Sequence, residues 1–343
     1  MKVLSKYIFG FLVLGLALGL NTATYAQDDA RSQAIALYNN GQEHAGNGQF
    51  MDAISSYERA LAIAQENGID DIVELTRTQI PRVYLRRASQ AYQQYQSTRS
   101  IADIQRTINY FRDAQGAAEE FGADDIVRQA RGNIPQFYYL KSVTEFRAEN
   151  FDDALESLNT AIELNANYAT AYYQRAITLK RMFPADVDRW MAEYDRAIEV
   201  AQRVNDNRTL NNARQSAAEE LIFRAVTLKD ERQFNRAIQL LERVENYDSN
   251  NADAHFRLAE IHNERGNFQQ ARDHANRALQ IETGSVVDRA KIYFELGMAQ
   301  KGLGNITQAC SAFENATYGE FAEPANHELQ FELKCEGHAQ GRR

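Results

Sequence analysis

The chain has 343 residues and a formal net charge of −9, and this acidic balance disfavours nonspecific binding to nucleic acid, which needs a basic face. Hydrophobic residues make up 44% of the chain, while its four prolines and eighteen glycines are too few for long disordered linkers. We therefore expect a chain that is ordered almost throughout.

Residues 1–26 predict an export signal. Two lysines precede an apolar run over residues 7–20, and small side chains follow up to Ala26. This order is typical of a secretory signal peptide that is cut after Ala26. The alternative is an uncleaved membrane anchor, but the run is shorter than the roughly 20 residues that cross a bilayer. We expect a mature chain without a transmembrane span, periplasmic if the source is a diderm bacterium.

The chain then repeats itself. Residues 57–88 align with residues 111–142, so that a glycine, a pair of aspartates and Pro81 superpose on a glycine, a second aspartate pair and Pro135. An alignment of this length indicates an array of structural repeats.

A shorter unit is clearest after Ala252 and again after Ala290. In the first of these copies Ala259, Ala271 and Ala278 place small residues at regular intervals between larger apolar ones. This pattern resembles the tetratricopeptide-repeat (TPR) family, whose unit has about 34 residues. The same frame begins near residues 34, 81, 135, 169, 218, 252 and 290.

The resemblance implies an all-α fold over residues 27–337. Each repeat would form two antiparallel helices, A and B, and about seven such hairpins would stack into a right-handed superhelical solenoid. Small side chains let the two helices approach closely, and the large ones fill the gaps between neighbouring repeats.

Three repeats start about 13 residues later than a regular array requires, at Pro81, Pro135 and Ala218. The inserted segments are good helix formers, and two begin with aspartates, which favour a helix N-terminus. We expect them to extend the A helices by about 20 Å each, with kinks at the two prolines. The alternative is a separate short helix before each repeat.

Residues 324–337 predict a capping helix, because Leu329 and Leu333 share one face in an otherwise polar segment. Residues 338–343 are expected to form a frayed tail. The cysteines, Cys310 and Cys335, predict a disulfide between the last repeat and this cap if the chain is exported. The alternative is two separate thiols.

The sequence predicts no catalytic site, no metal site and no cofactor. His255 and His262 lie seven residues apart on one helix face, but the TPR resemblance implies packing at both positions. Carboxylate or cysteine partners at ligand spacing are missing around them. No phosphate-binding loop or nucleophile elbow is present in the sequence.

The resemblance also implies a concave binding surface lined by the A helices. One register of these helices carries large apolar residues: Tyr38, Leu85, Tyr139, Tyr173, Ile222, Phe256 and Phe294. Exposed aromatics on such a wall are typical anchors for a partner. The alternative is that each ring packs within its own repeat.

Charge along this surface is uneven. Its N-terminal and central repeats carry Arg82, Arg86, Arg147, Lys180, Arg181 and Lys229, whereas the last two repeats carry Asp253, Glu260, Glu264 and Glu295. This division favours an anionic segment as the ligand of the N-terminal half. The alternative is a solvated helix face without a partner.

These patterns predict a non-enzymatic scaffold, exported to the cell envelope, that binds a protein or peptide through helix A. Two other functions stay open: a regulatory or enzyme-associated subunit with a small-molecule pocket, and a structural oligomer that stacks through its ends.

Overall fold

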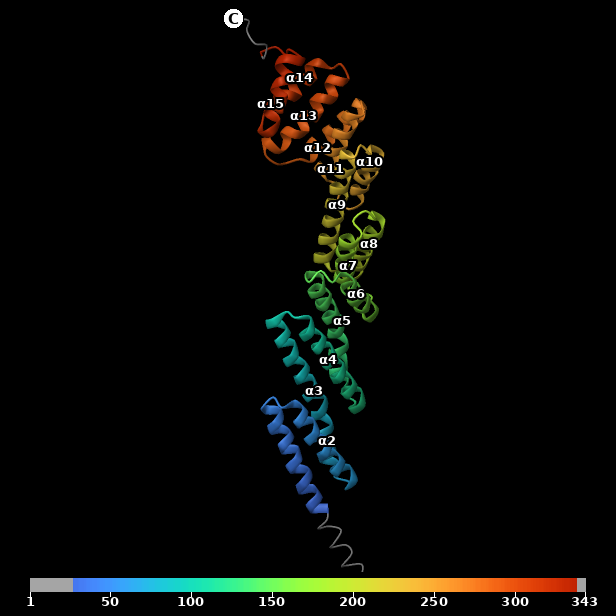
Figure 1. The fold of residues 1–343 in the computed structure, drawn as a ribbon, viewed down its shortest axis with the longest axis vertical. Helices are drawn as coiled ribbons and strands as arrows, with labels where there is room; N and C mark the ends of the chain where they lie inside the picture. Colours follow the sequence, from blue (N-terminus) through green and yellow to red (C-terminus); the bar gives the residue numbers. More distant parts are fainter. Residues whose placement is uncertain (1–26, 338–343) are drawn as a thin grey trace, which may run out of the picture. The chain divides into compact units, whose positions relative to one another are not determined.

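The computed structural model describes residues 27–337, and every regular element within them is helical (Figure 1). The expected signal peptide, residues 1–26, and the expected tail, residues 338–343, lie outside the described residues. The chain forms two compact units that divide between Trp190 and Met191. We call them the N-terminal unit and the C-terminal unit. The all-α, TPR-like repeat architecture expected from the sequence is confirmed.

Helical hairpins follow one another in the N-terminal unit, as the colours from blue to green show in Figure 1. The first A helix covers residues 27–46. The helices after it are α2 (Phe50–Glu66), α3 (Asp70–Thr98), α4 (Ile101–Phe121), α5 (Asp124–Arg147), α6 (Phe151–Leu164) and α7 (Ala169–Met182). Helix α8 (Val187–Val204) contains the boundary between the two units.

The C-terminal unit also consists of helices that follow one another along the chain. They are α9 (Asn207–Asp230), α10 (Phe234–Arg243), α11 (Ala252–Glu264), α12 (Phe268–Ile281), α13 (Val286–Gly302) and α14 (Ile306–Asn315). The short elements are η1 (Val244–Asn246), η2 (Gly319–Phe321), α15 (Ala322–His327) and η3 (Glu328–Glu332).

Alanines hold each hairpin together. Ala259 on α11 and Ala275 and Ala278 on α12 are fully buried, in one cluster with Phe256 and with Ile292 of the following hairpin. Small side chains let α11 and α12 approach closely, and the larger ones fill the space toward the next repeat. Neighbouring hairpins therefore complete each other's cores, as expected of a solenoid.

The three insertions are parts of continuous helices. Helix α3 runs without interruption through Pro81, α5 runs through Pro135, and α9 is continuous from Asn207. The alternative of separate short helices is therefore wrong. Aspartates at the N-termini of α3 and α5 favour this start through the helix dipole.

The cap differs from the expected helix over residues 324–337. Helical structure covers α15 and η3 and ends at Glu332, because Lys334 adopts a left-handed conformation with φ 54°. The backbone amide of Cys335 then donates to the carbonyl of Leu329 at 2.9 Å. This reversal carries Cys335 back toward α14.

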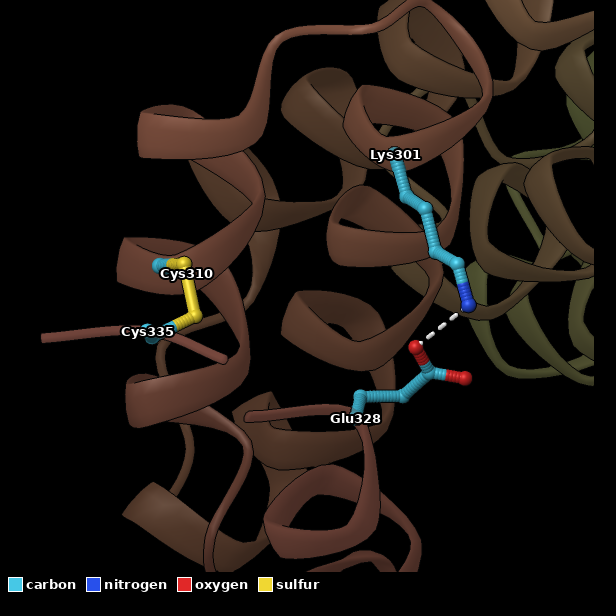
Figure 2. Close-up of a disulfide and its surroundings, with 4 residues drawn as sticks. All are labelled: Lys301, Cys310, Glu328 and Cys335. Atoms are coloured by element: carbon cyan, nitrogen blue, oxygen red, sulfur yellow. Dashed lines mark hydrogen bonds and ion pairs between the residues drawn. A yellow bond between two sulfur atoms is a disulfide. The ribbon is translucent and has the colours of Figure 1, made fainter. Parts of the chain in front are cut away.

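A disulfide joins Cys310 on α14 to Cys335, with 5.9 Å between the two Cα atoms (Figure 2). On the other side of the cap, Lys301 Nζ lies 2.6 Å from Glu328 Oε2 (Figure 2). Leu329 is fully buried in one cluster with Phe313 and Cys335. The cap is thus fixed to the last hairpin by a covalent bond, an ion pair and an apolar contact.

Candidate functional site: the A-helix wall

The A helices of successive repeats contact one another. Helix α5 touches both α3 and α7 in the N-terminal unit, and α11 touches both α9 and α13 in the C-terminal unit. We call the surface that these helices form the A-helix wall, and we treat it separately in each unit. No helix of residues 27–337 is both long and apolar enough to cross a membrane.

Two tyrosines of the N-terminal unit are anchored on this wall. The ring of Tyr38 lies 5.4 Å, centroid to centroid, from that of Tyr57 on α2. The ring of Tyr139 on α5 lies 5.4 Å from that of Tyr168, which precedes α7. Tyr38 and Tyr139 are both half-buried. Packing against a neighbour fixes each ring, and the rest of its surface stays accessible to a ligand.

The aromatic register does not continue as an open stripe in the C-terminal unit. Phe256 is only 4% exposed and belongs to the core that joins α11 to α12. The expectation that it offers an exposed ring is therefore wrong. Phe294 is half-buried, with its ring 5.5 Å from that of Phe313 and 5.4 Å from that of Phe321. It packs mainly beneath the cap.

Tyr173 on α7, in the N-terminal unit, is half-buried.

Arginines on the wall of the N-terminal unit are exposed. Arg86 on α3, Arg147 at the end of α5 and Arg181 near the end of α7 all face solvent. Within residues 27–337 none of the three has a carboxylate partner. Lys180, also on α7, is half-buried and already interacts with other groups. Arg86, Arg147 and Arg181 are thus available to an anionic ligand.

Charges on the wall of the C-terminal unit are instead paired between helices. Lys229 Nζ of α9 lies 2.5 Å from Glu260 Oε1 and 3.4 Å from Glu264 Oε1, both on α11. Lys291 Nζ of α13 lies 3.1 Å from Asp253 Oδ1. The predicted division of charge is therefore weaker than the sequence indicates: Lys229 is neutralised, and so are three of the predicted acids.

Glu295 is the remaining predicted acid of this wall. It forms no ion pair with another described residue. Its carboxylate accepts a hydrogen bond of 2.7 Å from Asn263 Nδ2. The pKa of Glu295 is raised to about 7, mainly by burial. Glu260 and Glu264 contribute to this shift, while Asn263 and Lys229 oppose it. A carboxyl group that titrates near neutral pH is typical of functional sites and of buried structural networks alike.

Three histidines stack between α11 and α12. His255 Nδ1 lies 3.2 Å from His274 Nδ1, and the ring of His262 is nearly parallel to that of His274 at a centroid distance of 5.5 Å. Burial lowers the pKa of all three, that of His274 to about 4. The expected packing role of His255 and His262 agrees with their burial. In the part of the chain that the structure describes, no group of side chains is arranged to hold a metal ion.

A cleft in the N-terminal unit was missed from the sequence. It has a volume of about 720 Å³ and lies between α2 and α4, with Glu58, Arg77 and Tyr84 among its lining residues. The internal alignment carried a signal for it: Gln65 stands where the second copy has Glu119, and Glu58 where it has Arg112.

The fold and the A-helix wall define the class of protein, a TPR-type helical repeat. Family profiles agree: one described as tetratricopeptide repeat matches residues 228–292, another residues 290–318, and a TPR repeat profile matches residues 144–182. These matches identify tetratricopeptide repeats in residues 144–182 and 228–318. No protein of curated function matches the sequence.

Several solved structures are similar to this chain. The structure of MamA protein has 16% identity and a TM-score of 0.35, covering 60% of this chain and 97% of its own. MamA from Desulfovibrio magneticus RS-1 has 17% identity and a TM-score of 0.32, with coverages of 55% and 93%. YrrB, described as a TPR protein with an unusual peptide-binding site, has 15% identity and a TM-score of 0.32, with coverages of 53% and 84%.

Proposed function

We propose that this TPR protein is a non-enzymatic scaffold that holds an acidic segment of a partner protein on the A-helix wall of its N-terminal unit. The single observation that carries the proposal is the exposure of Arg86, Arg147 and Arg181 without carboxylate partners among the described residues. Cations that stay unpaired on a wall of accessible tyrosine rings suit a peptide that combines carboxylates with large apolar side chains.

The charge of the whole chain supports a specific contact rather than general attraction. The formal net charge of −9 repels acidic peptides at long range. An acidic ligand is therefore held only where cations gather locally. Most of the cations on the wall of the C-terminal unit are engaged by its own acids, so the N-terminal unit is the better receptor.

The experiment uses the chain from residue 27 onward and a fluorescein-labelled peptide of alternating glutamate and phenylalanine. Fluorescence anisotropy at several salt concentrations measures its binding. The triple variant Arg86→Glu, Arg147→Glu and Arg181→Glu should weaken binding at least about tenfold and flatten its salt dependence. Arg128→Glu is the matched control, because Arg128 is an exposed arginine on α5, the helix that carries Arg147.

Two results would reject this function. One is equal binding of the glutamate peptide by wild type and triple variant. The other is equal loss in the Arg128→Glu control, which would mean that only overall charge matters. Circular dichroism of each variant shows whether the helices are retained.

Export to the cell envelope is a separate proposal. It rests on the order of charge, apolar run and small residues over positions 1–26. Fractionation of a diderm host that expresses the full chain, followed by mass measurement, tests it. The periplasmic protein should begin at Gln27. A cytoplasmic protein that keeps residues 1–26 would contradict export without affecting the proposed binding surface.

A further inference from the structure

The extended helix α3 opens a cleft on the B-helix side of the N-terminal unit. Helices α2 and α4 each pack along α3 but make at most marginal contact with each other. Because α3 begins eleven positions before Pro81, it is long enough for the two B helices to pack at different positions along its axis. The space left between them is the cleft of about 720 Å³, a volume within the usual range of ligand pockets.

Apolar side chains form the deeper part of this cleft. Leu61 of α2 is 7% exposed and Ile80 of α3 is 1% exposed. Tyr84 and Phe121 also line it and are half-buried. A large apolar side chain of a ligand would find contacts from three helices here.

Charged residues at the rim are without partners. Glu58, Arg77 and Glu120 line the cleft, are exposed, and form no ion pair with another described residue. The remaining charged lining residues neutralise each other: Arg87 lies 3.5 Å from Asp113. Two unpaired carboxylates thus face one unpaired guanidinium, and the rim carries a net negative charge.

The second copy of the same repeat has an ion pair at the equivalent place. Arg131, which corresponds to Arg77, lies 2.8 Å from Glu119. In the first copy Gln65 replaces Glu119, so Arg77 has no acid to pair with.

The aromatic position differs in the same way. Arg112 of the second copy lies over the ring of Tyr138 at 5.4 Å, and Tyr138 is only 8% exposed. In the first copy Glu58 replaces Arg112, and the corresponding Tyr84 is more exposed. Two substitutions therefore leave Arg77 without the ion pair, and Tyr84 without the arginine contact, that the second copy has at the equivalent positions.

We propose that this cleft is a second peptide-binding site, which takes an extended segment of a partner protein with a large apolar side chain flanked by lysine or arginine. The apolar side chain would pack on Leu61, Ile80 and Phe121. The flanking cations would pair with Glu58 and Glu120, while Arg77 donates to carbonyl groups of the peptide. The ligand differs in charge from the acidic segment proposed for the A-helix wall.

The test compares two labelled peptides on the chain from residue 27 onward. One has leucine and phenylalanine between lysines, and its twin has glutamates in place of the lysines. Fluorescence anisotropy should show that the lysine peptide binds wild type. Glu58→Arg should weaken its binding at least about tenfold, and Glu120→Gln at least about threefold.

The matched control is Glu119→Gln. It removes the same charge from the adjacent residue, but Glu119 is engaged by Arg131 and does not line the cleft. It should change the affinity less than about twofold. The A-helix wall variant Arg86→Glu should also leave the lysine peptide bound, which separates this site from the one proposed above.

Methyl NMR supplies an independent readout. The lysine peptide should shift the methyl resonances of Leu61 and Ile80 in wild type, and these shifts should be lost in Glu58→Arg. Binding that survives both cleft substitutions, or that falls equally in Glu119→Gln, would overturn the proposal. So would the absence of binding by the lysine peptide.

Discussion

Asn263 on α11 donates two hydrogen bonds from its side-chain Nδ2 to Glu295 on α13, one of 2.7 Å to the carboxylate Oε2 and one of 2.8 Å to the backbone carbonyl. A single side-chain amide of Asn263 therefore binds both the side chain and the backbone of Glu295 on the next A helix. Because the carboxylate is buried, its charge opposes folding even though it is hydrogen-bonded.

Replacing Glu295 by glutamine should make the C-terminal unit less sensitive to pH. The pKa of Glu295 is raised from 4.5 to about 7, so between these values the folded chain keeps a proton that the unfolded chain has lost. Wild-type stability therefore falls as pH rises across this window. At pH 8, Glu295→Gln should raise the free energy of unfolding by roughly 2 kcal/mol or less.

Urea unfolding at pH 5 and pH 8 measures this effect. The variant and wild type should be nearly equal at pH 5 and differ at pH 8. A variant that is destabilised equally at both values would show that the carboxylate contributes net stability and that burial does not raise its free energy.

The histidine stack should have the opposite pH dependence. The pKa of His274 is lowered from 6.5 to about 4 by burial and by the neighbouring His255 and His262. Below pH 6.5 the unfolded chain binds a proton that the folded stack excludes, so stability is lost as pH falls toward 4. Since His274 is half-exposed, we expect a loss of roughly 1–2 kcal/mol.

Charged groups around the stack act in both directions. Arg277 lowers the pKa of His255, and Glu245 raises it. Arg265 lowers the pKa of His262. Asp273 raises the pKa of His274.

The pH dependence of the stack is measured by thermal unfolding from pH 7 to pH 4. His274→Phe keeps an aromatic ring in the stack and should flatten the curve. The exposed His327, replaced by glutamine, should leave it unchanged; equal curves for His274→Phe and wild type would contradict the assignment.

The disulfide should stabilise the cap more than the repeats. It joins residues 25 positions apart, and closing a loop of this length in the unfolded chain contributes about 3 kcal/mol. The double variant Cys310→Ser and Cys335→Ser should expose α15 to hydrogen exchange while α11 and α12 stay protected. Wild type under reducing agent should behave in the same way. Equal protection of α15 in both forms would mean that the Lys301–Glu328 ion pair and Leu329 hold the cap without the covalent bond.

The helical architecture was predictable because its cause is local. Small residues such as Ala259 and Ala278 recur at fixed spacing, and the packing of an A helix on its own B helix needs little more. The continuous course of α3 agrees with the helix-forming residues of its insertion. The early end of the cap was not predictable, because the turn at Lys334 is a non-glycine residue with positive φ.

The candidate site was harder to predict because burial and pairing depend on the neighbouring repeat. Phe256 shares its register with Tyr38, but it is buried in one cluster with Ile292 from the next hairpin. Lys229 resembles the arginines of the N-terminal unit, yet its partners lie 31 residues away or more. The contrasts of Gln65 with Glu119 and of Glu58 with Arg112 are visible in the aligned copies, but only the structure shows that these positions lie at a cleft.

Glycines that face an aromatic ring in their own hairpin give a further prediction. A Cβ atom at Gly297 on α13 would lie 2.7 Å from the ring of Phe313 on α14, and one at Gly41 would lie 2.9 Å from the ring of Tyr57. Both rings are almost fully buried, so they cannot move aside without disturbing the core. Gly297→Ala and Gly41→Ala should each lower the free energy of unfolding by about 1–3 kcal/mol.

The matched control is Gly116→Ala. Gly116 lies inside helix α4, and a Cβ atom added there would meet nothing within 4 Å. Alanine favours the helix over glycine, so this variant should gain about 0.5–1 kcal/mol. Urea unfolding of the three variants should therefore give two losses and one gain. A gain at Gly297 would mean that α13 and α14 can separate at little cost, contrary to the close approach that the small residues of each hairpin allow.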